Sequence, residues 1–155
     1  MELTTGDKTE KINIKHTKDY QKIEGCVEVK DGKLNIAFNY TSSLNGEANL
    51  QIDDIQLVDE NGKVISKEEK TVKKGETSNI DNISESIGKI TNGDFETGDS
   101  TGWTAAIEDG FGVNDEDANS GKYKCYFWGQ GKQKLQQKVT ELENGSYTIC
   151  LLYTS

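Results

Sequence analysis

The chain is poor in the residues that catalytic and metal centres most often use. Its 155 residues include one histidine, three cysteines and no proline. His16 alone cannot build a zinc site or a catalytic triad, and because it follows an alternating run we expect it on the surface at a strand end. The cysteines Cys26, Cys125 and Cys150 lack metal-ligand spacing and leave one thiol over in any disulfide scheme. The composition therefore argues against histidine-based catalysis.

Long apolar runs and positive charge are also scarce. Hydrophobic residues make up 32% of the chain, and 27 acidic against 18 basic residues give a net charge of −9. That charge disfavours nucleic acid and anionic membranes, because the main attraction to phosphate becomes repulsion. No run approaches the length of a membrane span, and residues 1–7 lack the apolar core of a signal peptide. We expect an extracellular or cell-surface domain whose export signal lies outside this chain.

A first β-rich piece covers residues 1–58. Hydrophobic residues alternate with polar ones in several runs, as expected of half-buried strands. Asp31-Gly32 and Asn45-Gly46 separate three of these runs and are typical of hairpin turns, so hairpins are predicted at both places. The runs cover residues 12–14, 27–29, 34–39 and 50–58.

A polar segment over residues 59–89 follows. No aromatic residue occurs between Tyr40 and Phe95, and Lys, Glu, Ser and Asn dominate the segment. Such a stretch buries too little apolar surface to offset its ordering entropy, so we interpret it as a linker with at most one short strand or helical turn. A solvated helix over residues 66–74 is the competing interpretation.

The second β-rich piece, residues 90–149, carries most of the large aromatic residues. It opens with Asn-Gly-Asp-Phe-Glu at 92–96, which is followed by a Gly/Asp/Ser/Thr turn and then Gly102-Trp103. An aromatic residue between two acids before such a turn predicts a short strand at the edge of a β-sandwich. Trp103 is predicted to pack inside the fold.

Alternation over residues 122–128 predicts a strand with two different faces. Tyr123, Cys125 and Phe127 share the more apolar face, which is therefore the predicted core side. The opposite face carries Lys122, Lys124, Tyr126 and Trp128.

Segments 92–103, 112–128 and 139–148 together resemble the opening half of the jelly-roll carbohydrate-binding modules of secreted bacterial glycoside hydrolases. Ile-Asp-Asp-Ile at 52–55 resembles the closing strand of the same modules. Within that group the nearest likeness is to modules attached to arabinogalactan endo-β-1,4-galactanases. The resemblance implies an all-β fold, an antiparallel β-sandwich of the jelly-roll type.

The order of the two pieces implies a fragment of a tandem array. Residues 1–58 resemble the C-terminal half of one module and residues 90–149 the N-terminal half of the next. The halves are expected either to assemble into one permuted sandwich, with residues 50–58 beside 90–95, or to remain two unfinished halves.

The resemblance also implies a structural calcium ion beside the first and last strands. The ligand positions carried over are Glu96 and Asp53, or less favourably Asp54, with backbone carbonyls completing the hard oxygen set that calcium prefers. The alternative is that these acids cap strand ends in solvent. The acidic run 114–121 is not an EF-hand, because its glycine falls one place late and Tyr126 occupies the position of the bidentate Glu. A polar loop is expected there.

Sugar contacts are predicted on the face that carries Trp128, Tyr126 and Lys124. A pyranose ring offers a C–H face that stacks on aromatic rings, while its hydroxyls need hydrogen-bonding partners. The alternative is that Trp128 is buried as ordinary core. Candidate hydrogen-bonding neighbours close behind in the sequence are Gln130, Gln133, Gln136 and Gln137.

The resemblance implies non-catalytic binding of a plant polysaccharide such as β-galactan. In that reading the chain keeps a secreted glycoside hydrolase on its substrate, and the adjacent modules and catalytic domain belong to the parent protein. No acids here show the pattern of a glycosidase acid/nucleophile pair. The alternative function is a structural or adhesive β-sandwich repeat of a bacterial surface protein.

The last six residues, 150–155, suggest a different origin from the rest. Cys-Leu-Leu-Tyr-Thr-Ser can be encoded by TGT CTC TTA TAC ACA TCT, which resembles the transposase end sequence used to prepare sequencing libraries. We therefore expect these residues to be translated adapter, with the natural sequence leaving this one at Ile149.

Overall fold

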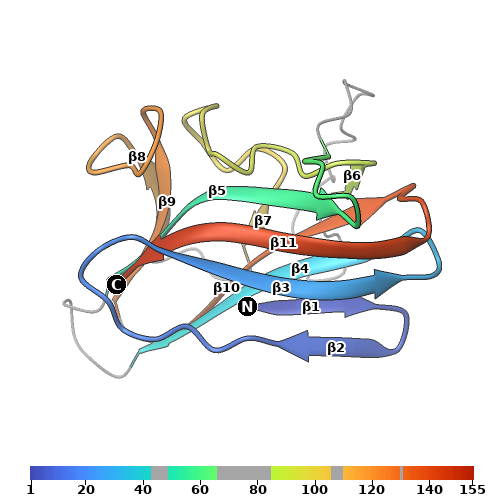
Figure 1. Cartoon of the computed structure of the whole chain (residues 1–155). Helices are drawn as coiled ribbons and strands as arrows, with labels where there is room; N and C mark the ends of the chain where they lie inside the picture. The colour runs from blue at the N-terminus through green and yellow to red at the C-terminus, as the bar shows by residue number, and fades with distance from the viewer. Residues whose placement is uncertain (43–48, 66–84, 106–109, 130) are drawn as a thin grey trace.

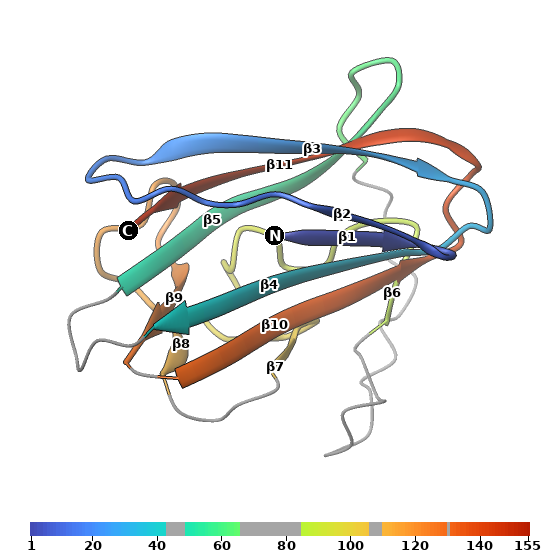
Figure 2. The ribbon, with the colours of Figure 1, turned by 90° about the horizontal axis from the view of Figure 1, so that it is seen from below.

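The computed structural model describes residues 1–42, 49–65, 85–105, 110–129 and 131–155. These residues form a sandwich of two β-sheets, which confirms the predicted all-β antiparallel fold (Figures 1 and 2). Sheet A contains, in spatial order, β2 (Lys8–Lys11), β1 (Glu2–Thr5), β4 (Leu34–Ser42), β10 (Gly131–Thr140), and then both β6 (Glu85–Ile87) and β7 (Thr104–Ala105). Sheet B contains β3 (Gln21–Val29), β11 (Gly145–Thr154), β5 (Asn49–Asp59), β9 (Lys124–Trp128) and β8 (Phe111–Asn114).

Both sheets are five strands wide because β6 and β7 share one position. β6 pairs with residues 138–140 of β10 and β7 pairs with residues 135–136, along the same outer edge. The β6 pairing is parallel, and the other strand pairs of the two sheets are antiparallel.

The two predicted pieces share both sheets. β11, from the second piece, lies between β3 and β5 from the first, as Figure 1 shows in red, blue and green. In sheet A, β10 of the second piece pairs with β4 of the first along residues 131–139. Either piece alone would leave strand edges unpaired and an apolar face in water, and association removes both costs. The chain is therefore one sandwich and not two half-sandwiches.

Aromatic side chains from both pieces meet in the core. The ring centroids of Phe38 and Trp103 are 5.8 Å apart, as are those of Tyr40 and Phe127. Trp103 is 5% exposed and its Nε1–H donates to the Asn92 carbonyl at 3.0 Å, which confirms its predicted packing role. Burial of side chains of this size contributes about 1.5–3 kcal/mol each. These contacts therefore hold the two pieces together.

β5 contains a bulge at Asp53 and Asp54. Ile52 and Ile55 are both buried, although a spacing of three would put them on opposite faces of a regular strand. Asp54 has a φ of 52°, and the pairing with β11 shifts register at the same place. The extra residue lets both isoleucines face the core, while Asp53 points to the outer face of sheet B.

The opening segment of the second piece docks beside β5 just past this bulge. β9 pairs with β5 at residues 49–52, and beyond the bulge the Ile55 N–H donates to the Gly93 carbonyl at 2.9 Å. The closing strand therefore lies beside the opening segment, as expected for a single assembled sandwich. Gly93 has no room for a side chain, since a Cβ there would lie 2.2 Å from Ile55 O.

The strand predicted at 92–96 is instead a series of turns. Asn92 and Phe95 have φ values of 50° and 56°, which a strand does not tolerate. Phe95 is nevertheless fully buried. The prediction of backbone geometry was therefore wrong, and the turns themselves place the aromatic side chain in the core.

Residues 12–14 also lie outside the strands, because β2 ends at Lys11. Ile12 and Ile14 still pack against the core, so the alternation correctly predicts which side chains are partly buried. His16 is exposed as predicted, but it does not end a strand.

The two hairpin predictions are wrong. β3 and β4 belong to different sheets, and so do β4 and β5, so neither pair of strands forms a hairpin. Gly32 has a φ of 72° and its carbonyl accepts from Leu142 N at 3.0 Å, in the connection between β10 and β11. Residues 43–48 lie outside the described residues. Turn residues predict a chain reversal, not the sheet that the next strand joins.

The predicted linker and C-terminal segment are described in part. Residues 66–84, with the alternative helix at 66–74, lie outside the described residues, and the short strand β6 falls within the linker range. Residues 150–154 extend β11 and bury Leu151 and Tyr153. The adapter origin of these residues stays a prediction, and the codons at residues 150–155 test it.

We predict that Gly93→Ala destabilises the fold by about 3 kcal/mol, the upper end of typical overpacking costs, because the added methyl meets backbone that cannot move aside. Gly6→Ala is the control: its Cβ meets nothing within 4 Å, and its φ of 51° alone costs about 1 kcal/mol. Urea denaturation of both variants measures the difference. Equal costs would show that the contact between β5 and the opening segment is not tight.

Candidate functional site

The three predicted sugar contacts, Trp128, Tyr126 and Lys124, line one groove on the outer face of sheet B. The groove has a volume of about 440 Å³ and lies where β5, β9 and β8 run side by side. Its other lining residues are Gln51, Asn114, Glu116 and Asp117.

The alternation of β9 decides which side chains reach the groove. Cys125 and Phe127 are fully buried on the core side, as predicted. Trp128 is 51% exposed, which contradicts the alternative that it is ordinary core. Its backbone is held on both sides, because Trp128 N donates to Gly110 O at 2.6 Å and Trp128 O accepts from Gln133 Nε2 at 2.7 Å. The indole therefore projects from a fixed backbone position.

Tyr126 lies flat across the neighbouring strand β8. Its cross-strand partner is Gly112, where a Cβ would lie 2.5 Å from the tyrosine Oη. The glycine thus leaves the space that the phenol ring fills. Tyr126 and Trp128 together give the groove one aromatic wall.

Lys124 is on the outer face of sheet B but is buried there. It is 2% exposed, and its Nζ donates to Asn114 Oδ1 at 3.0 Å. Burial lowers the pKa of this ammonium, while the charges of Asp117, Glu116 and other acids nearby raise it. The ammonium therefore forms a polar floor to the groove.

Gln51 and Asp117, which line the groove, are joined through a tyrosine from a distant part of the chain. Tyr20 Oη lies 3.2 Å from Gln51 Oε1 and 3.1 Å from the Asp117 carbonyl, so its hydrogen ties β5 to the acidic loop. Burial and the charges of Asp53 and Asp117 raise the pKa of Tyr20. Gln51 and its contact with Tyr20 could not be predicted from the sequence, since no local pattern singles these residues out. The sequence predicted 114–121 as a polar loop, but not as part of the site.

The predicted metal ligands hold the same loop. Asp53 is fully buried, and its Oδ2 accepts from Asn119 N at 2.9 Å and Ser120 N at 3.1 Å. Glu96 Oε1 accepts from Lys122 N at 2.8 Å. The closing strand of one piece and the opening segment of the other therefore bind one turn. Asp53 is not a solvent-exposed strand cap, whereas Glu96 is exposed.

The donor set fits calcium in its chemistry. The ion pairs within the described residues do not include Asp53, so its charge has no directly paired cation. Burial raises its pKa to about 6, with the Ser120 N–H lowering it and Asp54 raising it. In the described part of the chain no three acidic, His or Cys side chains cluster to hold a metal. Backbone carbonyls would have to complete the coordination.

Three of the predicted glutamine neighbours are buried and serve the fold. Gln137 Oε1 accepts from Thr91 N at 2.8 Å, and its Nε2 donates to the carbonyls of Thr91 and Gly102. Gln133 holds the Trp128 carbonyl, and Gln136 is 5% exposed. Gln130 lies outside the described residues.

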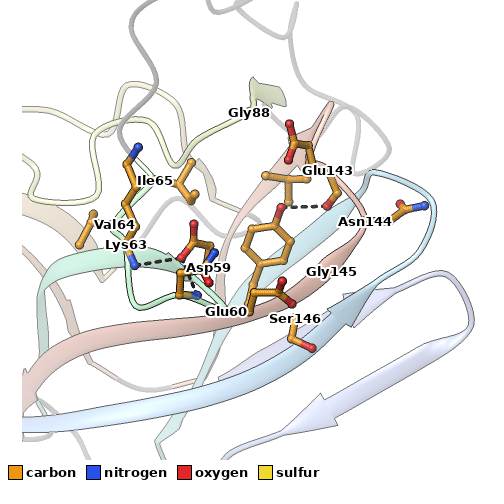
Figure 3. Close-up of a pocket in the computed structure, with 13 residues that line it drawn as sticks. Asp59, Glu60, Lys63, Val64, Ile65, Gly88, Glu143, Asn144, Gly145 and Ser146 are labelled. Carbon is orange, nitrogen blue, oxygen red and sulfur yellow. Dashed lines mark hydrogen bonds between the residues drawn. The ribbon is translucent and has the colours of Figure 1, made fainter.

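A second cavity of about 470 Å³ lies where β5 and β11 meet at the other end of the sandwich (Figure 3). Its polar groups are engaged in turns: Asp59 Oδ1 accepts from Lys63 N at 2.9 Å, and the Tyr147 hydroxyl donates to the Glu143 carbonyl at 2.8 Å. Val64 and Ile65 add apolar surface to one side. Without an exposed aromatic platform, this cavity is a weaker candidate than the Trp128 groove.

Comparison with known protein families, with curated proteins and with solved structures finds no match. Within the described residues, no helix is long and apolar enough to cross a membrane.

We predict that Asp53 makes the fold less stable as pH rises. Its pKa is raised from 3.8 to about 6, so the folded state favours the protonated form. Its contribution is therefore fully present below about pH 4 and is lost as pH rises through about 6. Urea unfolding in chelator across this range should show the fall in the wild type relative to Asp53→Asn. A constant difference between the two proteins would contradict the raised pKa.

Proposed function

We propose that this chain is a non-catalytic carbohydrate-binding module. One observation carries the proposal: Trp128, which is exposed, and Tyr126 line a groove whose other lining residues are all polar or charged. Aromatic rings stack on the C–H face of a sugar, and amides, acids and an ammonium satisfy its hydroxyls. Exposed tryptophan otherwise carries a cost in water, which binding would remove.

The proposed ligand is β-galactan or a related plant polysaccharide. The support is the resemblance of segments 92–103 and 112–128 to modules of endo-β-1,4-galactanases. In this proposal the parent protein is a secreted, extracellular or cell-surface glycoside hydrolase, and catalysis belongs to a domain outside this fragment. The module then raises the local concentration of enzyme on its substrate.

We also propose a structural calcium ion held by Asp53 and Glu96. The support is that both carboxylates bind the turn at 119–122, and that Asp53 is buried and forms no direct ion pair with any cation in the described part of the chain. A divalent ion would offset the charge of the buried carboxylate. It would also tie together the two pieces that contribute the ligands.

Trp128→Ala should weaken galactan binding by about 1–3 kcal/mol, the cost of losing one aromatic stacking partner. The thermal midpoint should hardly change, because half of the side chain is already exposed. Trp103→Ala is the matched control and should cost about 3–5 kcal/mol of stability, as for other buried aromatics. Affinity electrophoresis in galactan and thermal unfolding measure the two effects.

A large loss of stability with unchanged binding in Trp128→Ala would show that the indole is structural. Failure of the wild type to bind galactan or related plant glycans would favour the alternative, an adhesive or structural repeat of a surface protein.

Calcium should raise the thermal midpoint by about 5–10 °C at saturating concentration, since a ligand at a hundred times its Kd adds about 2.7 kcal/mol. Chelator should reverse the gain, and magnesium should not replace calcium. The double variant Asp53→Asn, Glu96→Gln should lose the response, whereas Asp7→Asn, far from the turn, should keep it. An equal response in the double variant would place the ion elsewhere.

A further inference from the structure

The groove combines acids at its rim with one buried cation at its floor. Glu116 and Asp117 line it and are exposed, and Asp115 precedes them in the same loop. Lys124 lies below them, 2% exposed. The charges of the loop acids and Asp53 act on this ammonium, so they lie close enough to offset it. A ligand in the groove therefore meets negative charge at the edge and positive charge at the bottom.

Lys124 has hydrogen-bonding capacity to spare. An ammonium carries three N–H donors, and within the described residues one of them is used, in the hydrogen bond to Asn114 Oδ1. Leaving donors of a buried charge unpaired is costly, so a ligand oxygen reaching the floor would be strongly favoured. This buried side chain, together with the exposed Trp128, points to a ligand and not to a merely structural hollow.

We propose that the groove selects uncharged sugars, with Lys124 donating to a hydroxyl oxygen of the sugar and Glu116 and Asp117 repelling uronate carboxylates. This inference rests on the proposed carbohydrate binding and adds the charge class of the ligand. The rim acids also accept hydrogen bonds from neutral hydroxyls, so they favour a neutral sugar while opposing an anionic one.

Amino sugars are disfavoured by the same arrangement. An ammonium on the ligand would gain from the rim acids and from the face of Trp128. At the floor of the groove, however, the ligand ammonium would be repelled by the Lys124 ammonium. It would also bring further N–H donors to a place where the donors of Lys124 need acceptors. Neutral hydroxyls satisfy both parts of the groove.

The test uses one oligosaccharide in three chemical forms and two charge states: neutral galactotetraose, the same oligosaccharide oxidised to anionic carboxylates at C6, and the neutral methyl ester of that oxidised form. At a fixed calcium concentration and low ionic strength, calorimetry should show about fivefold to tenfold weaker binding of the oxidised form, as expected for charges several ångströms apart in water. Methyl esterification should restore binding. At high salt the difference should shrink to about twofold, because exposed charges are screened.

Two matched pairs of variants assign the effect to residues. Glu116→Gln with Asp117→Asn should bring the oxidised form within about twofold of the neutral one, whereas Asp7→Asn with Glu10→Gln, the same charge change on an exposed turn and strand, should leave the ratio unchanged. Lys124→Met should weaken binding of the neutral sugar at least tenfold. Lys122→Met, an exposed lysine two positions away whose Nζ lies over the Tyr123 ring, should not.

The outcomes separate the two levels of the proposal. Equal or tighter binding of the oxidised form, or tighter binding of an oligosaccharide with amines at C6, overturns the charge selection while carbohydrate binding stands. A ratio that the Glu116 and Asp117 variant leaves unchanged also overturns it. Binding of none of the sugars overturns the proposed function and this inference with it.

Discussion

The bulge in β5 is the constraint on which the rest of the molecule depends. Ile52 and Ile55 can both reach the core because Asp53 and Asp54 insert one extra residue between them. β5 has a different neighbour on each side of the bulge. Before the bulge it pairs with β9, and after it the Ile55 N–H donates to the Gly93 carbonyl of the opening segment. Two connections between the pieces of the chain therefore meet at one irregularity.

The bulge also positions the loop that lines part of the groove. Because Asp53 points outward and accepts from the backbone of Asn119 and Ser120, it holds down the loop that carries the rim acids. Beside it, β9 is in register with β5 up to Ile52, which sets Gln51 opposite Tyr126. A buried carboxylate usually weakens a fold unless it is compensated. Here hydrogen bonds from the loop provide part of the compensation, and the proposed cation would provide more.

The sequence predicts those features that depend on neighbours within one strand. Alternation over residues 122–128 placed Cys125 and Phe127 in the core and Trp128 outside, since side-chain direction has a period of two in any strand. The sequence did not predict which sheet a strand joins after a turn. Asp31-Gly32 reverses the chain as expected, yet β3 and β4 join different sheets, and local turn chemistry holds no information about that choice.

The same limit explains what was missed in the site. Tyr20, Gln51 and Asp117 come from three separate segments and meet only after the sandwich forms, so no window of sequence contains their relation. Lys124 shows the converse case. Its direction follows from alternation, but its burial and its hydrogen bond to Asn114 of β8 depend on tertiary packing, and the proposed role at the floor of the groove rests on that burial. The charge selectivity proposed for the groove would therefore be a property of the tertiary structure, since no single segment of the sequence contains the residues that produce it.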